Sequence, residues 1–90
     1  MTCDVKEVLI ALNAVIGGGE IDVDAVKSLR WSVDPEMEGL MDDIYRELII
    51  FASDDDDRRR DRSYDETWRR NMIKWRDRLT SALERRDSLS

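Results

Sequence analysis

The sequence predicts an all-α fold, a small antiparallel four-helix bundle, in a single domain that spans residues 1–90. Apolar residues recur at intervals of three and four nearly everywhere, and no stretch alternates with period two for long. Residues that interrupt helices are few: three consecutive glycines at 17–19, a fourth at 39 and one proline at 35. Four amphipathic segments with short connections are typical of a helical bundle.

The first two helices are expected at residues 4–16 and 22–31. Asp4 is suited to cap the first helix, and the glycines at 17–19 are expected to end it, because glycine accepts the left-handed backbone found just beyond many helices. Asp22 is the expected N-cap of the second helix, whose looser apolar stripe ends at Trp31.

The third helix is expected at residues 35–52. Asp34 followed by Pro35 is typical of an N-cap and the first helical position, where a missing N–H costs nothing. A continuous apolar stripe then leads to Phe51, with acidic residues on both of its sides. Ile49 and Ile50 fall outside this stripe, so they need another helix or a partner to cover them.

The last helix is expected at residues 64–86, after a capping box formed by Ser63 and Glu66. Trp68 and Trp75 share its apolar stripe, and we expect both rings in the core rather than on a surface that stacks bases. Arginines and one lysine line its flanks. Residues 53–62, between the two long helices, are expected to form a solvated, highly charged loop.

The composition argues against catalysis. The chain has no histidine, which excludes a histidine base and the usual zinc ligands, and Cys3 is the only cysteine, so no intrachain disulfide can form. The glycines at 17–19 follow a helix and lack the lysine of a phosphate-binding loop. A calcium loop aligned on Asp54 would place Arg58 at its fifth position, which requires an oxygen ligand, and Arg59 at its sixth, which requires glycine. We therefore expect no enzyme, no cofactor and no metal.

The N-terminal residues predict a cytoplasmic protein that does not contact a membrane. Residues 1–7 carry two acidic residues against one lysine, unlike the basic start of a signal peptide. The apolar stretch at 8–16 is too short to span a bilayer, and Asn13 interrupts it.

Charge divides the chain sharply. Residues 1–57 contain 15 acidic and 4 basic residues, whereas residues 58–90 contain 11 basic and 6 acidic residues. Asp54–Asp57 follow the expected end of the third helix, where the helix dipole disfavours anions by about 0.3–1 kcal/mol. Either the adjacent arginines or an external cationic surface must therefore hold these four carboxylates together.

The order of these features resembles the colicin-like immunity proteins of the colicin D type. The similarity comprises an opening amphipathic helix, the segment GGEIDVDAV, a long helix that starts after Val33-Asp34-Pro35-Glu36 and continues through LMDDIYRELIIFASDDDDR, and a final helix. The acidic stretch Asp54–Asp57 is the closest point of similarity.

The resemblance implies a small acidic protein that inhibits a basic, tRNA-cleaving nuclease toxin stoichiometrically. Its carboxylates would replace RNA phosphates in the basic active site, and charge complementarity would speed association. The residues that would contact the toxin are Asp54, Asp55, Asp56 and Asp57, with Asp42, Asp43 and Glu47 extending the patch.

Two other functions stay open from the residues alone. In a homodimeric assembly or adaptor module, the acidic third helix would pair with the basic last helix of another copy, and Ile49 and Ile50 would be buried between copies. In a nucleic-acid regulator, Arg58–Arg62 would contact phosphates, although the acidic remainder of the protein would repel the same backbone.

Overall fold

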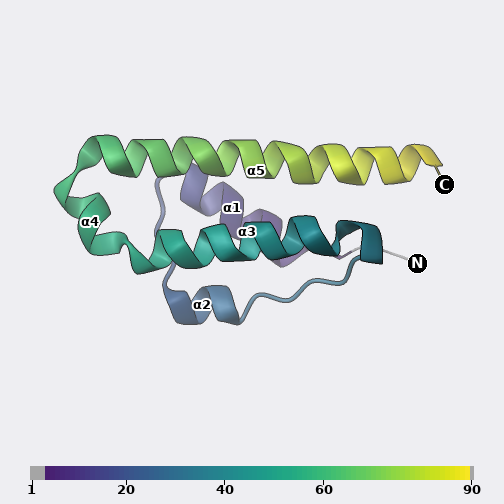
Figure 1. Ribbon diagram of the computed structural model, residues 1–90, viewed down its shortest axis with the longest axis horizontal. Helices are drawn as coiled ribbons and strands as arrows, with labels where there is room; N and C mark the ends of the chain where they lie inside the picture. Colours follow the sequence, from purple (N-terminus) through teal and green to yellow (C-terminus); the bar gives the residue numbers. More distant parts are fainter. Residues whose placement is uncertain (1–3, 90) are drawn as a thin grey trace.

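The computed structural model describes residues 4–89, with side chains described as far as residue 85. The chain is mostly helical, which confirms the all-α class. Five helices are present where four were expected: α1 (Lys6–Ile16), α2 (Val23–Lys27), α3 (Pro35–Ser53), α4 (Asp55–Arg60) and α5 (Arg62–Leu89). Figure 1 shows α3 and α5 lying side by side and running in opposite directions, with α4 joining them at one end.

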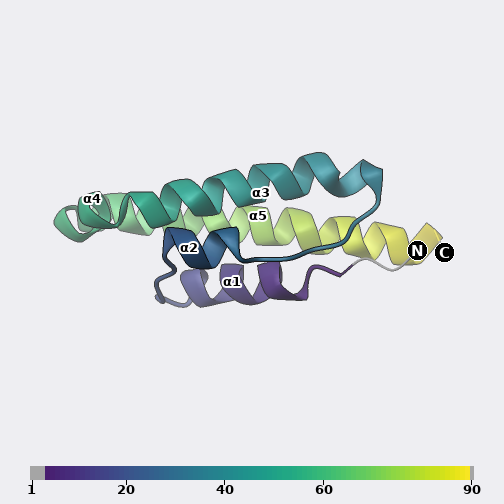
Figure 2. The same cartoon turned by 90° about the horizontal axis from the view of Figure 1, so that it is seen from below.

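The two long helices form a hairpin that the remaining elements cover on one face. Helix α1 packs on α5 and α2 packs on α3, and Figure 2 shows both short helices on the same side of the hairpin. The result is elongated, with extents of 46 × 22 × 18 Å. One face of the hairpin is thus left without a covering helix among the described residues.

The core forms where α1, α3 and α5 meet. It follows the apolar stripes of the sequence, because residues three and four apart in a helix share a face. The largest fully buried side chains are Phe51, Leu12, Met41, Ile44, Leu48, Met72, Leu79, Val8, Val15 and Val26. Trp68 and Trp75 are partly buried against this core, which agrees with the prediction that they serve packing.

Several predicted boundaries are confirmed. Helix α1 ends at Ile16, and Gly18 adopts the positive φ of 102° that the glycine stop signal predicts. The Asp22 carboxylate accepts a hydrogen bond of 2.7 Å from the Ala25 amide, as an N-cap does. Helix α3 begins at Pro35, directly after Asp34.

Other boundaries need correction. Helix α2 ends at Lys27 rather than near Trp31, whose ring instead packs 5.6 Å from that of Tyr45 on α3. Helix α1 begins at Lys6 rather than at Asp4, because the Asp4 backbone forms an isolated bridge with Ser32.

The start of the last helix and the expected loop before it also differ from the prediction. Helix α5 begins at Arg62, so Ser63 lies inside the helix rather than at its N-cap. Asp61 is the capping residue instead, and its carboxylate accepts a hydrogen bond of 3.2 Å from the Tyr64 amide. Most of the expected loop at 53–62 is helix α4.

Candidate protein-binding surface

Helix α4 changes the interpretation of the acidic run. The backbone breaks helical geometry at Asp54, and Asp55–Asp57 then form the first turn of α4, with Arg58–Arg60 in its last turn. Acidic residues favour the positive end of a helix dipole and basic residues the negative end. The charge order of this segment therefore suits its local structure, and no external cation is required to explain why four aspartates occur together.

Two of the four aspartates have partners within the chain. The Tyr64 hydroxyl donates a 2.7 Å hydrogen bond to Asp54, and this contact raises the pKa of Tyr64, because an ionised phenol could not donate and would repel the carboxylate. Asp55 forms an ion pair with Arg59 at 3.4 Å, one helical turn away. Asp56 and Asp57 are exposed. The run thus offers a partner chiefly its last two carboxylates, Asp56 and Asp57.

Arg58, expected to be solvated, is instead buried, with only 3% of its surface exposed. Its guanidinium donates to the Phe51 carbonyl oxygen through Nε at 3.1 Å and through Nη2 at 2.9 Å. It also lies 3.6 Å from the centroid of the Phe51 ring, a cation–π geometry. Arg58 therefore holds α4 against the end of α3.

Glu20 and Asp65 neutralise this buried charge. Arg58 is 3.0 Å from Glu20, in the turn after α1, and 2.9 Å from Asp65 on α5. Desolvation alone would lower the pKa of Arg58, but the hydrogen bonds that it donates to both carboxylates outweigh this effect and raise that pKa. The pKa of Glu20 is lowered, first by its hydrogen bond with Arg58 and despite partial burial.

Arg69 completes the cluster. Arg69 forms ion pairs with Asp65, at 2.8 Å, and with Glu20. Its hydrogen bond to Asp65 is the largest cause of the lowered pKa of that carboxyl. Its Nη1 donates to the carbonyl oxygens of Val15 at 2.6 Å and Gly19 at 2.7 Å. We call Glu20, Arg58, Asp65 and Arg69 the arginine cluster. It joins the turn after α1 to both α4 and α5.

The sequence contained only a weak signal for this cluster. Asp65 and Arg69 stand four residues apart, a spacing that favours an ion pair on a helix. Nothing local connects Glu20 with Arg58, because 38 residues separate them.

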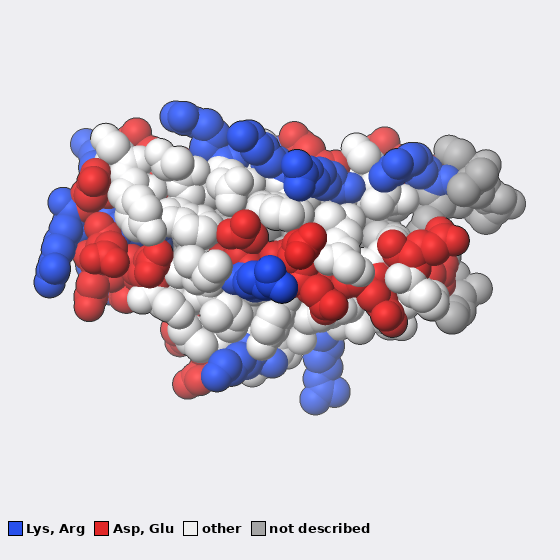
Figure 3. All heavy atoms as spheres, in the orientation of Figure 1, with Lys and Arg blue, Asp and Glu red and all other residues white. Residues whose placement is uncertain are grey.

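The α3 carboxylates do not form one cluster with the α4 aspartates. Asp43 and Glu47 are four residues apart and lie on the same side of α3, facing α5, whereas Asp42 is turned about 100° around the helix from Asp43. Asp43 and Asp54 are separated by about 16 Å along the helix axis, at 1.5 Å per residue. Figure 3 shows acidic side chains both along α3 and at the α4 end.

Neither a metal site nor a membrane-spanning helix is found among the described residues. Among them, no group of three or more histidine, cysteine, aspartate or glutamate residues could hold a metal ion. Within the same part of the chain, no helix has the length and apolar character needed to cross a membrane. Cys3 lies outside the described residues.

Comparison with family models, curated proteins and solved structures finds no match to this chain.

Proposed function

We propose that the protein is a non-catalytic binding protein of the immunity type, which binds and inhibits a basic, tRNase-like nuclease toxin through exposed carboxylates. The observation that carries this proposal is the presentation of Asp56 and Asp57 on α4. Both are exposed in the first turn of a short helix, and the helix itself is held by the buried Arg58.

Preorganisation explains why such an arrangement suits tight binding. A flexible acidic loop would lose conformational entropy when it docks, whereas a helix fixed by the five hydrogen bonds of the Arg58 guanidinium has already lost it during folding. Phosphate mimicry requires carboxylates at set separations, and a helical turn provides them. Asp54 and Asp55 lie beside these two residues, with one carboxylate oxygen each committed within the chain.

Electrostatics favour a cationic partner over nucleic acid. The chain carries a formal net charge of −6, and Arg58 of the basic run is buried and neutralised by Glu20 and Asp65. Arg59 is engaged with Asp55, and Arg62 lies 3.6 Å from Glu66. The basic run 58–62 therefore presents far less free positive charge to a phosphate backbone than its sequence suggests.

The test is a capture experiment with matched variants. The protein is immobilised, and nuclease-treated lysate of the source cells is passed over it at low and at moderate salt. Wild type is compared with Asp56→Asn/Asp57→Asn and with Glu7→Gln/Asp24→Asn, which removes two exposed negative charges from elsewhere on the surface. The retained protein is identified, and its tRNA cleavage is assayed with increasing amounts of each variant.

We expect wild type and the control variant to retain one basic protein and to block its RNA cleavage at one equivalent. The α4 variant should retain helical circular dichroism and lose most of this inhibition. If the α4 variant inhibits as well as wild type, Asp56 and Asp57 are not the contact residues. If the retained protein has no nuclease activity, the proposal that the partner is a nuclease toxin is wrong.

A further inference from the structure

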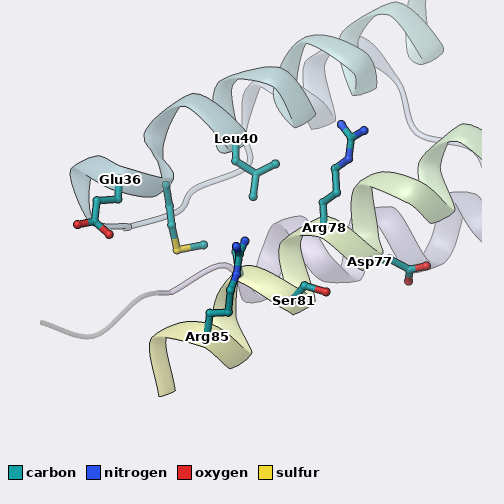
Figure 4. Close-up of a pocket in the computed structure, with 8 residues that line it drawn as sticks. Glu36, Leu40, Asp77, Arg78, Ser81 and Arg85 are labelled. Carbon is teal, nitrogen blue, oxygen red and sulfur yellow. The ribbon is translucent and has the colours of Figure 1, made fainter. Parts of the chain in front are cut away.

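The uncovered face of the α3–α5 hairpin carries two depressions, one at each half of the groove between the helices. The larger lies between the N-terminal half of α3 and the C-terminal half of α5, has a volume of about 910 Å³, and includes Glu36, Leu40, Arg78 and Arg85 in its lining. The smaller, of about 370 Å³, lies nearer α4 and is lined by Glu47, Thr67, Trp68, Arg70, Asn71 and Lys74. In Figure 4, Leu40 and Arg85 point into the space between the helices from opposite sides.

The two sides of this groove, formed by α3 and α5, carry opposite charge. Figure 3 looks onto this face and shows a row of basic side chains along α5 above a row of mostly acidic side chains along α3, with a basic side chain among them. On this side α3 contributes Glu36, Asp43 and Glu47, while α5 contributes Arg70, Lys74, Arg78 and Arg85, all of them exposed except the half-buried Glu47.

The two rows do not neutralise each other. Among the side chains that the structure describes, residues 4–85, no ion pair joins Glu36, Asp43 or Glu47 to α5. Asp77 is the one carboxylate of α5 in the lining, and it points away from the groove (Figure 4) and pairs with its neighbour Arg76. Within the basic row, Arg78 lies over the ring of Trp75 on the same helix, 4.8 Å from its centroid. The charges of the two rows thus have no ion-pair partner across the groove and can pair with charges outside the chain.

Apolar side chains lie between and beside the charged rows. Leu40, Trp68 and Ala82 are partly buried in the groove lining. Ile50 continues the α3 row seven residues after Asp43, and Tyr64 lies one turn before Trp68, with their rings 6.4 Å apart. Ile50 and Tyr64 are two of the three large hydrophobic residues that the described chain exposes. A polar rim around an apolar centre is the usual composition of a protein interface.

We propose that this face binds a second copy of the chain, with a two-fold axis running along the groove. Rotation by a half-turn about that axis places α3 of one copy over α5 of the other, so that each acidic row meets a basic row. A two-fold axis across the groove would instead oppose like charges, which costs binding energy. The charge pattern thus selects one of the two symmetric arrangements.

The same axis pairs residues that lie at the same level of the groove. Glu47 and Lys74 line one depression, so the rotation brings Glu47 of each copy to Lys74 and Arg70 of the other. Glu36 and Arg85 line the second depression, and the rotation brings Glu36 to Arg85 and Arg78. Asp56 and Asp57 belong to α4, at the end of the hairpin (Figure 1), outside these pairings.

The available area is sufficient for a stable dimer. A standard protein interface takes about 800 Å² from each partner, which is roughly one eighth of the 6013 Å² surface of this chain. Helix α3 is about 28 Å long at 1.5 Å per residue, and α5 lies beside it over this length.

The test uses complementary charge reversals and sedimentation equilibrium of the full chain, without any added partner. Wild type should show about twice the monomer mass of 10.6 kDa. Glu47→Lys and Lys74→Glu should each weaken dimerisation at least tenfold, because each variant creates two like-charge contacts per dimer. An equimolar mixture of the two variants should restore the dimer, because every contact then joins opposite charges.

The control is Asp42→Lys, which makes the same charge change on the side of α3 turned away from Glu47 and should leave the dimer intact. Circular dichroism checks that each variant folds, and Glu36→Lys with Arg85→Glu replaces the first pair if either does not. A wild-type monomer at all concentrations would overturn the proposal, and so would a mixture that stays monomeric. Neither result bears on toxin binding by α4, which is measured separately.

Discussion

Replacing Arg58 by alanine tests whether the arginine cluster holds the fold together. The variant leaves the Phe51 carbonyl oxygen without its two guanidinium donors. It also removes one of the two arginine partners of Asp65, which is 23% exposed, and of Glu20, which is 50% exposed, so that both carboxylates keep only Arg69. It also empties the position over the Phe51 ring. Because Arg58 itself is buried, these contacts are lost at a position shielded from solvent.

The expected loss of stability is about 3 kcal/mol. Breaking a buried ion pair typically costs 3–5 kcal/mol, and the low end applies here because water can solvate Glu20 when Arg58 is gone. A domain of 90 residues has about 5–13 kcal/mol of stability in total. For this size, about 3 kcal/mol corresponds to a fall in melting temperature of roughly 12–24 °C.

The measurement is urea unfolding followed by circular dichroism, with Arg60→Ala as the matched control. Arg60 is in the same turn of α4 and exposed, so its loss should change stability by less than about 0.5 kcal/mol. Arg58→Lys keeps the charge but cannot reproduce the planar fork of donors, and it should lose about 2 kcal/mol. A loss below about 1 kcal/mol for Arg58→Ala, close to that of the control, would refute the reasoning that α4 is anchored through this side chain.

Two further predictions concern the same fold. Contacts with Arg58 and Arg69 lower the pKa of both Glu20 and Asp65, so the stability that these two carboxylates contribute should be complete above about pH 4.5, the ordinary pKa of a glutamate, and be lost as pH falls through the lowered pKa values. Urea unfolding at several pH values should show the stabilities of wild type and Glu20→Gln converging in acid. A constant difference between them down to pH 2 would contradict this. Gly39→Ala should raise stability by about 0.5–1 kcal/mol, because Gly39 lies within α3 and an added Cβ there would contact nothing. Gly18→Ala should lower stability by about 1–2 kcal/mol, because Gly18 has a φ of 102°. Thermal unfolding of the two variants measures both changes, and equal shifts in melting temperature would contradict the backbone argument.

Much of the fold was accessible from the sequence, because helix faces and helix ends are encoded locally. Apolar spacing predicted which residues of α1, α3 and α5 are buried, and the glycine stop and the caps at Asp22 and Asp34 predicted three helix boundaries. The division of the α3 carboxylates between two sides was also accessible, since it follows from 3.6 residues per turn.

The α4 segment was not predicted, although its sequence carries the matching charge order. The sequence pattern places Asp54–Asp57 in a charged loop directly after the third helix, where their charges conflict with the helix dipole. A break at a single residue, Asp54, turns the same aspartates into the start of the next helix, where the dipole favours them. The error therefore comes from one helix boundary. With α4 in place, the external cationic surface, one of the two alternatives left open by the sequence, is not needed to explain the run, and Asp55 pairs with the adjacent Arg59.

By itself, the sequence determined the helical class, the apolar faces and the division of charge between the two halves of the chain. Only the tertiary structure decided that Arg58 is buried rather than solvated, because its partner Glu20 is 38 residues away along the chain. The tertiary structure likewise decided that the acidic side of α3 lies along the basic side of α5, with an open groove between them. Local patterns specify which face of a helix is buried, but the identity of its neighbours depends on how the whole chain packs.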